Sequence, residues 1–204
     1  MPERPYHHGN LKAELVRTGI ALLEEEGLPA LTLRAIAARA GVSHAAPRNH
    51  FKSLRDLLTA IATEGFRLHA AAMRAGLPPD APREARLHAA MEGYARFARE
   101  HPALFALMFS PRDCDMYDPD LLAASAASYA ILADIARDLD WDKADLPDAQ
   151  GRTETMLWSF VHGHAVLAAT GLLGGPDGQP RFAVADIMPA FGYRPRKHGP
   201  GSAD

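Results

Sequence analysis

Hydrophobic residues recur along most of this chain at the three- and four-residue spacing of α-helices, and no segment shows the strict alternation of a half-buried strand. The spacing predicts helices over residues 11–26, 32–41, 53–76, 82–100, 119–140 and 150–173, a short helix beginning at 43, and an apolar segment at 101–110. The last residues, 194–204, have the composition of a disordered tail. The pattern therefore predicts an all-α fold.

Residues typical of helix ends stand where these helices begin and stop. Gly27 ends the first helix after three glutamates, and Thr32 is placed to cap the second. Ser53 is followed three residues later by Asp56, which resembles a capping box with Asp in place of the usual Glu. Pro82 suits the first turn of the next helix, where its missing amide hydrogen costs no bond. These signals indicate short N-terminal helices followed by longer ones.

The segment GVSHAAPRNHF, residues 41–51, predicts an unusual helix. Ser43 is placed to cap it, yet Pro47 follows only four residues later, where a proline removes an amide donor and crowds the preceding turn. The bond that Pro47 cannot make would go to the Ser43 carbonyl, which lies at the helix start and can tilt aside. We therefore expect a helix that is short and slim.

Residues 32–50 have the spacing of a helix-turn-helix. Gly41 supplies a left-handed turn between the two short helices, while Ile36, Ala37 and Ala40 make the inner stripe. In such a motif the second helix enters the major groove of DNA with its N-terminal residues at the base edges. Helical hairpins of this size also occur in proteins that do not bind DNA, so the spacing leaves both functions open.

Charge is distributed unevenly along the chain. Residues 1–75 carry 10 Lys and Arg against 7 Asp and Glu, and residues 76–204 carry 12 against 18, for a net charge of −3. A basic first third joined to an acidic remainder favours a polyanion as the partner of the N-terminal segment, although a solvated imbalance would look the same.

Composition restricts the class of protein. The chain of 204 residues is 48% hydrophobic and 23% charged, as expected for a soluble globular protein of one large or two modest domains. Its one cysteine, Cys114, excludes an internal disulfide framework and suits a reducing compartment. No segment is long and apolar enough for a signal peptide or a membrane span. We expect a cytoplasmic protein that does not bind membranes.

Several segments resemble the TetR family of bacterial transcriptional repressors. They are TLRAIAARAGVS at 32–43, HF at 50–51 and SLRDLL at 53–58. Four further segments resemble one branch of the family, which has a Trp-His-Gly-type regulatory domain: YHHGNL at 6–11, GVSHAAP at 41–47, HPALFALMF at 101–109 and WSFVHG at 158–163. The resemblance implies an all-helical homodimer with an N-terminal three-helix helix-turn-helix domain and a larger helical domain that binds ligand and dimerises. We place the DNA-binding domain at 1–53, a connecting helix at 54–76, the ligand-binding and dimerisation domain at 77–193 and the tail at 194–204.

The candidate DNA-contacting residues surround the motif. They are Thr32, Arg34, Ser43, His44, Ala45, Ala46, Arg48, Asn49, His50, Lys52 and Arg55. Alanine methyl groups can contact thymine methyl groups, and His44 can bond a base or a phosphate, whereas Ser43 can also serve only as a cap. The family usually has Tyr at the position of Arg48 and Lys at that of Leu54, both for phosphate contacts. Arg48 can replace the tyrosine as a bidentate donor, and Lys52 and Arg55 lie close enough to replace the lysine.

Bulky apolar residues with a few polar ones recur in the second half of the chain. Core packing explains most of them, but a subset can line a pocket for a small, mostly apolar effector: Phe97, Phe105, Met108, Phe109, Tyr129, Trp158 and His162. His162 and His164 are two residues apart and do not share a helix face, which argues against a metal site. The aspartates beside Cys114 would raise the pKa of its thiol, which argues against a redox sensor. We expect neither a metal nor a cofactor.

These residues favour a ligand-responsive transcriptional regulator that is not an enzyme, and specifically a repressor that binds a palindromic operator in double-stranded DNA as a homodimer. We expect the dimer to form through the helix at 150–173 and the segment FAVADIMPAF at 182–191. The alternative is a helical-bundle carrier or enzyme without DNA binding. No Ser-His-Asp arrangement, metal spacing or phosphate loop supports an enzyme, although dispersed residues can also assemble an active site.

Overall fold

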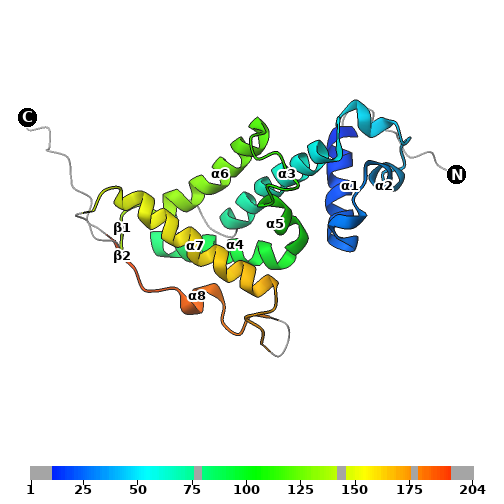
Figure 1. Ribbon diagram of the computed structural model, residues 1–204. Helices are drawn as coiled ribbons and strands as arrows, with labels where there is room; N and C mark the ends of the chain where they lie inside the picture. The colour runs from blue at the N-terminus through cyan, green and yellow to red at the C-terminus, as the bar shows by residue number, and fades with distance from the viewer. Residues whose placement is uncertain (1–10, 76–79, 142–145, 176–178, 194–204) are drawn as a thin grey trace, which may run out of the picture. The chain divides into compact units, whose positions relative to one another are not determined.

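The computed structural model describes residues 11–75, 80–141, 146–175 and 179–193 (Figure 1). Its elements, in order, are α1 (Leu11–Glu26), η1 (Leu28–Ala30, a 3₁₀ helix), α2 (Leu33–Arg39), η2 (Ala46–Asn49, also 3₁₀), α3 (Leu54–Arg74), α4 (Arg83–Glu100), α5 (Pro102–Met108), α6 (Pro119–Ala136), β1 (Leu139–Asp140), α7 (Ala149–Ala169), α8 (Val184–Ile187) and β2 (Gly192–Tyr193). Nearly all of this regular structure is helical, which confirms the predicted fold class. No described helix is long and apolar enough to cross a membrane.

The chain divides into two compact units, each built from two stretches of sequence. Unit 1 consists of residues 1–69 and 100–128, and unit 2 of residues 70–99 and 129–204. Helices α3 and α6 contribute residues to both units. The domain boundaries at residues 53 and 76 were drawn from motifs and stay a prediction, and the predicted tail at 194–204 lies outside the described residues.

Capping in the N-terminal helices follows the local sequence. The Thr32 hydroxyl accepts a hydrogen bond from the Ala35 amide over 3.0 Å, as a helix N-cap does. At the other end of α2, Gly41 has a φ of 69°, and the amide of Val42 bonds the Ala37 carbonyl over 3.0 Å. This is the Schellman arrangement, in which a left-handed residue lets the chain turn back over the last helical turn. Both predictions about α2 are confirmed.

Large aliphatic side chains fill the core of unit 1. Leu15 of α1, Ile36 of α2, and Leu57 and Ile61 of α3 are each fully buried. Burial of a side chain of this size contributes about 1.5–3 kcal/mol, so the packing of α1, α2 and α3 is a major source of stability for this unit. Helix α5 is joined to α1 by a hydrogen bond of 3.0 Å from the Leu104 amide to the carboxylate of Glu24.

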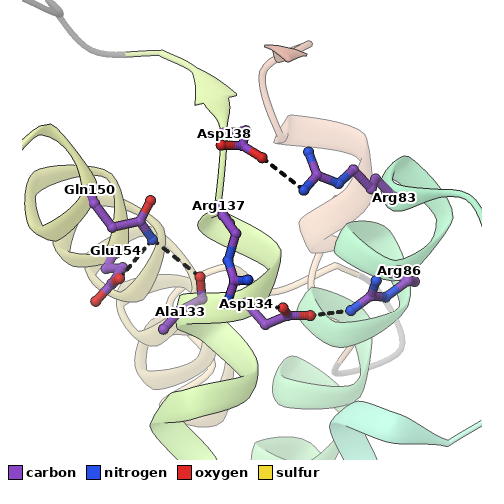
Figure 2. A network of polar contacts seen from close by, with 8 residues as sticks. All are labelled: Arg83, Arg86, Ala133, Asp134, Arg137, Asp138, Gln150 and Glu154. Atoms are coloured by element: carbon purple, nitrogen blue, oxygen red, sulfur yellow. Dashed lines mark hydrogen bonds and ion pairs between the residues drawn. The ribbon is translucent and has the colours of Figure 1, made fainter. Parts of the chain in front are cut away.

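Polar contacts in unit 2 join the ends of three helices (Figure 2). Arg83 of α4 donates to the carboxylate of Asp138 over 2.9 Å, and Arg86, one turn further along α4, pairs with Asp134 of α6. From the opposite side, Gln150 of α7 donates to a backbone carbonyl of α6 over 3.2 Å. These groups are partly exposed, so each ion pair contributes at most about 1 kcal/mol. They fix the relative placement of α4, α6 and α7, while apolar burial supplies most of the stability.

The structure corrects three details in the second half of the chain. Helix α6 ends at Ala136 and not at 140, because residues 139–140 form a two-residue antiparallel ladder with 192–193, a pairing that no alternating pattern predicts. Helix α7 ends at Ala169 and not at 173, because Gly171 (φ 74°) forms a second Schellman turn. The sequence predicts helices alone, and the two short strands β1 and β2 correct this expectation.

Candidate functional site

The predicted recognition helix is a single 3₁₀ turn. It spans Ala46–Asn49, its N-cap is Ala45, and no side-chain hydrogen bond caps it, so the prediction that Ser43 caps an α-helix is wrong. The reason is Pro47, which has no amide hydrogen for a bond four residues back. The neighbouring amides bond three residues back instead: Ala46 to the Ser43 carbonyl over 3.0 Å, and Arg48 to the Ala45 carbonyl over 3.1 Å. Pro47 itself is buried, so its ring also anchors the turn.

The predicted DNA-contacting residues all belong to unit 1 and lie at its surface. They come from the start of α2, the segment that ends in η2, and the residues around the start of α3. All are exposed except Ala46, which is half-buried: Thr32, Arg34, Ser43, His44, Ala45, Arg48, Asn49, His50, Lys52 and Arg55. The structure therefore makes these side chains, apart from the hydrogen-bonded guanidinium of Arg55, available to a partner, and their contact with DNA stays a prediction.

Two arginines of this surface have no acidic partner among the described residues. From Gly27 to Arg55 the sequence contains no Asp or Glu. Within the described residues, Arg34 and Arg48 form no ion pair, and both are exposed. A guanidinium in this situation suits a phosphate, which it can bind with two parallel hydrogen bonds.

Two other arginines of the same segment are engaged within unit 1. Arg39 pairs with Glu25 of α1, with a shortest separation of 2.5 Å between guanidinium nitrogen and carboxylate oxygen. Arg55 donates to the backbone carbonyls of residues 111, 112 and 114. Lys52 is exposed, and its amide and charge help the Ser53 hydroxyl, the larger cause, to lower the pKa of Asp56. Both residues expected to replace the family's lysine are exposed, but the guanidinium of Arg55 is already hydrogen-bonded within unit 1.

The predicted effector-binding residues fall into two clusters, one in each unit. In unit 1 the Phe105 and Phe109 rings meet edge to face with their centroids 5.2 Å apart, and Phe66 meets Phe109 in the same way at 5.4 Å. Met108 lies so close to Gly65 that a Cβ on this glycine would be 2.9 Å from the Met108 sulfur. Phe105 and Met108 are buried, so this cluster packs as core.

In unit 2 the aromatic residues form a row along α7. Trp158 and His162 are one helical turn apart, with ring centroids separated by 6.3 Å, and the Tyr129 ring lies 5.8 Å from that of Trp158. Tyr129 donates to the carboxylate of Glu154 over 2.9 Å, and burial together with this carboxylate raises the pKa of Tyr129 to about 12. Tyr129 and Trp158 are partly exposed, whereas Phe97, predicted with them, is buried.

Tyr94 of α4 connects the row to the rest of unit 2. Its hydroxyl lies 2.8 Å from His162 Nδ1 and accepts a hydrogen bond from Trp158. Burial raises the pKa of Tyr94 far above its ordinary value and lowers the pKa of His162. Tyr94 therefore stays protonated, and its hydroxyl donates a hydrogen bond to Nδ1 of the neutral His162 imidazole. The Trp and His of the WSFVHG segment thus share one buried hydroxyl.

A groove of about 1120 Å³ lies in unit 1. Residues of α1, of α3 and of the segment 100–120 line it together with His50 and Phe51, and none of the predicted effector-binding residues is among them. Three of its carboxylates already have a structural role: Asp56 and Asp118 cap α3 and α6, and Glu24 bonds the start of α5.

Two family patterns match this chain and together cover most of it. Residues 15–61 match the family described as "Bacterial regulatory proteins, tetR family", and residues 87–188 match the one described as "Tetracyclin repressor-like, C-terminal domain". The chain belongs to the TetR family. It is a ligand-responsive, DNA-binding regulator of transcription, and members of this family are typically not enzymes.

Solved structures resemble this TetR family member over most of its length. A protein of unknown function from Rhodococcus sp. RHA1 is 36% identical, covering 86% of this chain and 92% of that chain, with a TM-score of 0.67. The fold alone is shared with the TetR-like transcriptional regulator LfrR from Mycobacterium smegmatis, solved in complex with proflavine (22% identity, 86% and 90% of the two chains, TM-score 0.55). The same holds for a TetR-family transcriptional regulator from Haemophilus influenzae RD (17%, 82% and 88%, 0.56). No curated protein matches the sequence.

Sequence reasoning missed two polar groups in this TetR regulator. Tyr94 is not among the predicted effector-binding residues, although its hydroxyl contacts two of them. His69 is buried in unit 1, where its Nδ1 is hydrogen-bonded to the Ser128 hydroxyl over 2.8 Å and its ring lies 6.3 Å from that of Phe105. The sequence does contain a sign that His69 is buried, because it follows Phe66 by three residues and so lies on the same face of α3.

Cys114, for which the sequence argues against a role as a redox sensor, lies between α5 and α6. Its thiol is buried, and burial, with a smaller effect from Asp113, raises its pKa to about 12. A thiol held in its neutral form is a poor nucleophile. Burial is thus a stronger reason for its inertness than the flanking aspartates from which we argued.

Proposed function

We propose that this regulator is a cytoplasmic repressor that binds a palindromic operator as a homodimer and leaves it when a small, mostly apolar effector binds. The observation that carries the proposal is the pair of uncompensated cations, Arg34 and Arg48, beside the exposed recognition turn. Their guanidinium groups suit phosphates on either side of a groove, while His44 and Ala45 suit base edges. Repression follows when bound protein excludes the polymerase from a promoter that overlaps the operator.

The exposed face of α7 supports the homodimer. Trp158, Val166 and Leu167 of this helix are 40–42% exposed, and Phe182 and Leu172, beyond its C-terminal end, are 51% and 74% exposed. Gly163 lies among the helical residues, and a Cβ built on it would meet nothing within 4 Å. Apolar side chains around a small residue allow a second copy of α7 to approach closely, and a two-fold pairing of this kind matches a palindromic operator.

The aromatic row of unit 2 supports the effector site. Tyr129, Trp158 and His162 combine large apolar rings with a hydroxyl, an indole N–H and an imidazole, which is the usual composition of a small-molecule site. We therefore assign effector contact to this row, and to Phe105, Met108 and Phe109 a packing role that supports unit 1. The effector would be mostly apolar with one or two hydrogen-bonding groups.

The test is selection of bound duplexes from a random-sequence pool by the purified protein. We expect enrichment of inverted half-sites whose centres are about one helical turn of DNA, or a multiple of it, apart. Enriched sites without two-fold symmetry would contradict the homodimer, and no enrichment would contradict sequence-specific binding. Transcription from a promoter that contains the selected site should fall when protein is added; a rise would identify an activator.

The dimer is tested by light scattering on two matched variants. Leu167→Arg places a charge on the exposed face of α7, whereas Leu122→Arg places the same charge at a similarly exposed position of α6 (42% and 49% exposed). We expect Leu167→Arg to be monomeric and Leu122→Arg to remain a dimer. A dimeric Leu167→Arg protein would move the interface to another surface.

A further inference from the structure

Arg55, which was expected to contact DNA, is hydrogen-bonded to a segment of its own unit. Its guanidinium donates to three backbone carbonyls before α6: to Arg112 over 3.1 Å, to Pro111 over 3.3 Å and to Cys114 over 2.6 Å. A planar guanidinium presents its donors in a fixed fork, so three acceptors on one segment determine the orientation of the side chain. To reach a phosphate, Arg55 would have to break these bonds.

Thr59, one turn further along α3, holds the same segment by a second contact. Its hydroxyl accepts a hydrogen bond from the Asp115 amide over 2.9 Å and donates to the Arg55 carbonyl over 2.8 Å. Thr59 is only 4% exposed, so it cannot contact DNA. Arg55 and Thr59 together bind residues 111–115, and we call this pair the α3 clamp.

The segment that the clamp holds is itself well ordered by short-range contacts. The Ser110 hydroxyl donates to the Asp113 carboxylate over 2.6 Å, and the Cys114 amide bonds the Ser110 carbonyl over 3.0 Å. The Cys114 side chain is buried and faces the Leu107 carbonyl at the end of α5. The acceptors that face Arg55 are therefore fixed in place, which lets the clamp transmit a displacement of either side to the other.

The clamp joins the two halves that the family patterns separate. Arg55 and Thr59 lie within the 15–61 match to the DNA-binding region, whereas residues 111–115 lie within the 87–188 match to the C-terminal region. Arg55 is also the second residue of α3, which begins five residues after the recognition turn ends. A change in the clamp therefore alters the support on which that turn is mounted.

We propose that Arg55 and Thr59 are positioning residues, which set the helix-turn-helix against residues 111–115 and raise its affinity for DNA without touching DNA. Loss of the clamp frees α3 to change its angle, so the recognition turn meets the groove in the right orientation for a smaller fraction of the time. The proposal rests on the DNA-binding function alone, and it holds whether the protein represses or activates.

The test compares Arg55→Lys and Thr59→Val with Arg67→Lys as the matched control, because Arg67 is an exposed arginine of α3 that pairs with Glu64 of the same helix. Lysine keeps the charge but cannot reproduce the guanidinium fork, and valine keeps the shape of threonine without its hydroxyl. The probe is a duplex selected from a random pool by the wild-type protein, with affinity measured over a sodium chloride series. We expect both clamp variants to bind on the order of five- to tenfold more weakly with an unchanged salt slope, and Arg67→Lys to bind as tightly as the wild type.

Hydrogen exchange on the protein without DNA provides the independent readout. Amides of residues 112–116 should exchange faster in Arg55→Lys and Thr59→Val than in the wild type, at a temperature where circular dichroism shows all variants folded. Unchanged exchange would overturn the clamp even if no DNA sequence can be selected. Wild-type affinity in Arg55→Lys, together with a salt slope lower by about one in Arg55→Ala, would overturn the proposal in favour of a phosphate contact. If Arg55→Ala does not fold, wild-type affinity in both Arg55→Lys and Thr59→Val still overturns it.

Discussion

The close approach of α3 and α4 in unit 2 makes Gly93→Ala a severe test of the packing. A Cβ on Gly93 would lie 2.3 Å from the Ala72 carbonyl oxygen and 2.8 Å from the Met73 Cα. Both atoms belong to a helix backbone, so neither can move without moving the whole end of α3. The neighbouring contacts of Tyr94, which is 3% exposed, would then open as well.

The magnitude follows from two opposing terms. Overpacking of a dense core costs about 1–3 kcal/mol, and a clash with backbone on this scale belongs at the upper end. Alanine gains about 1 kcal/mol over glycine inside a helix. We therefore expect Gly93→Ala to lower the free energy of unfolding by about 2 kcal/mol and the Tm by about 4–8 °C.

The assay is thermal and urea unfolding at two protein concentrations, with Gly163→Ala as the control. Gly163 is also a helical glycine, but no atom lies within 4 Å of its added Cβ. At low concentration Gly163→Ala should therefore raise the Tm by about 2–4 °C. At high concentration this gain should shrink if α7 forms the dimer interface. Dimer formation then stabilises the folded wild type by mass action, and the added methyl group of the variant weakens its own dimer. A Tm for Gly93→Ala equal to or above that of the wild type would refute the close approach of α3 and α4.

Features that depend on a few neighbouring residues were predictable from the sequence. Thr32 caps α2, Gly41 ends it, and the Ser53 hydroxyl bonds the Asp56 amide over 3.1 Å, as the expected capping box requires. The Asp56 carboxylate in turn accepts a hydrogen bond from the Lys52 amide over 2.9 Å. Each of these bonds spans three or four residues, so a short window of sequence contains both partners.

Features that depend on distant residues were not predictable. Arg55 meets its carbonyl partners 56 to 59 residues away, and Tyr94 meets His162 68 residues away. An exposed-looking arginine beside a DNA-binding motif gives no sign that a later loop will occupy it. The effect of Pro47 extends beyond the one hydrogen bond that the sequence shows to be lost. The neighbouring amides also change to 3₁₀ geometry, which the sequence does not indicate.

Three further experiments address capping, DNA contact and protonation. Thr32→Ala should lower the free energy of unfolding by about 1 kcal/mol in urea titrations, because it removes the cap of α2. Arg48→Ala should weaken binding to all duplexes about equally and lower the salt slope by about one; loss of operator preference at constant slope would make Arg48 a base reader. The last concerns His162, whose pKa burial lowers and whose Nδ1 accepts from Tyr94. A folded-state pKa below the unfolded value of about 6.5 means that the unfolded chain takes up the proton first as the pH falls, so stability is lost below that value. His162→Gln keeps an acceptor for Tyr94 and cannot titrate. As the pH falls from about 7.5 to about 5, the unfolding free energy of this variant relative to that of the wild type should therefore rise. Titrations common to both proteins cancel in this difference. A difference that stays constant with pH, or falls, would show that His162 keeps or gains its proton in the folded protein.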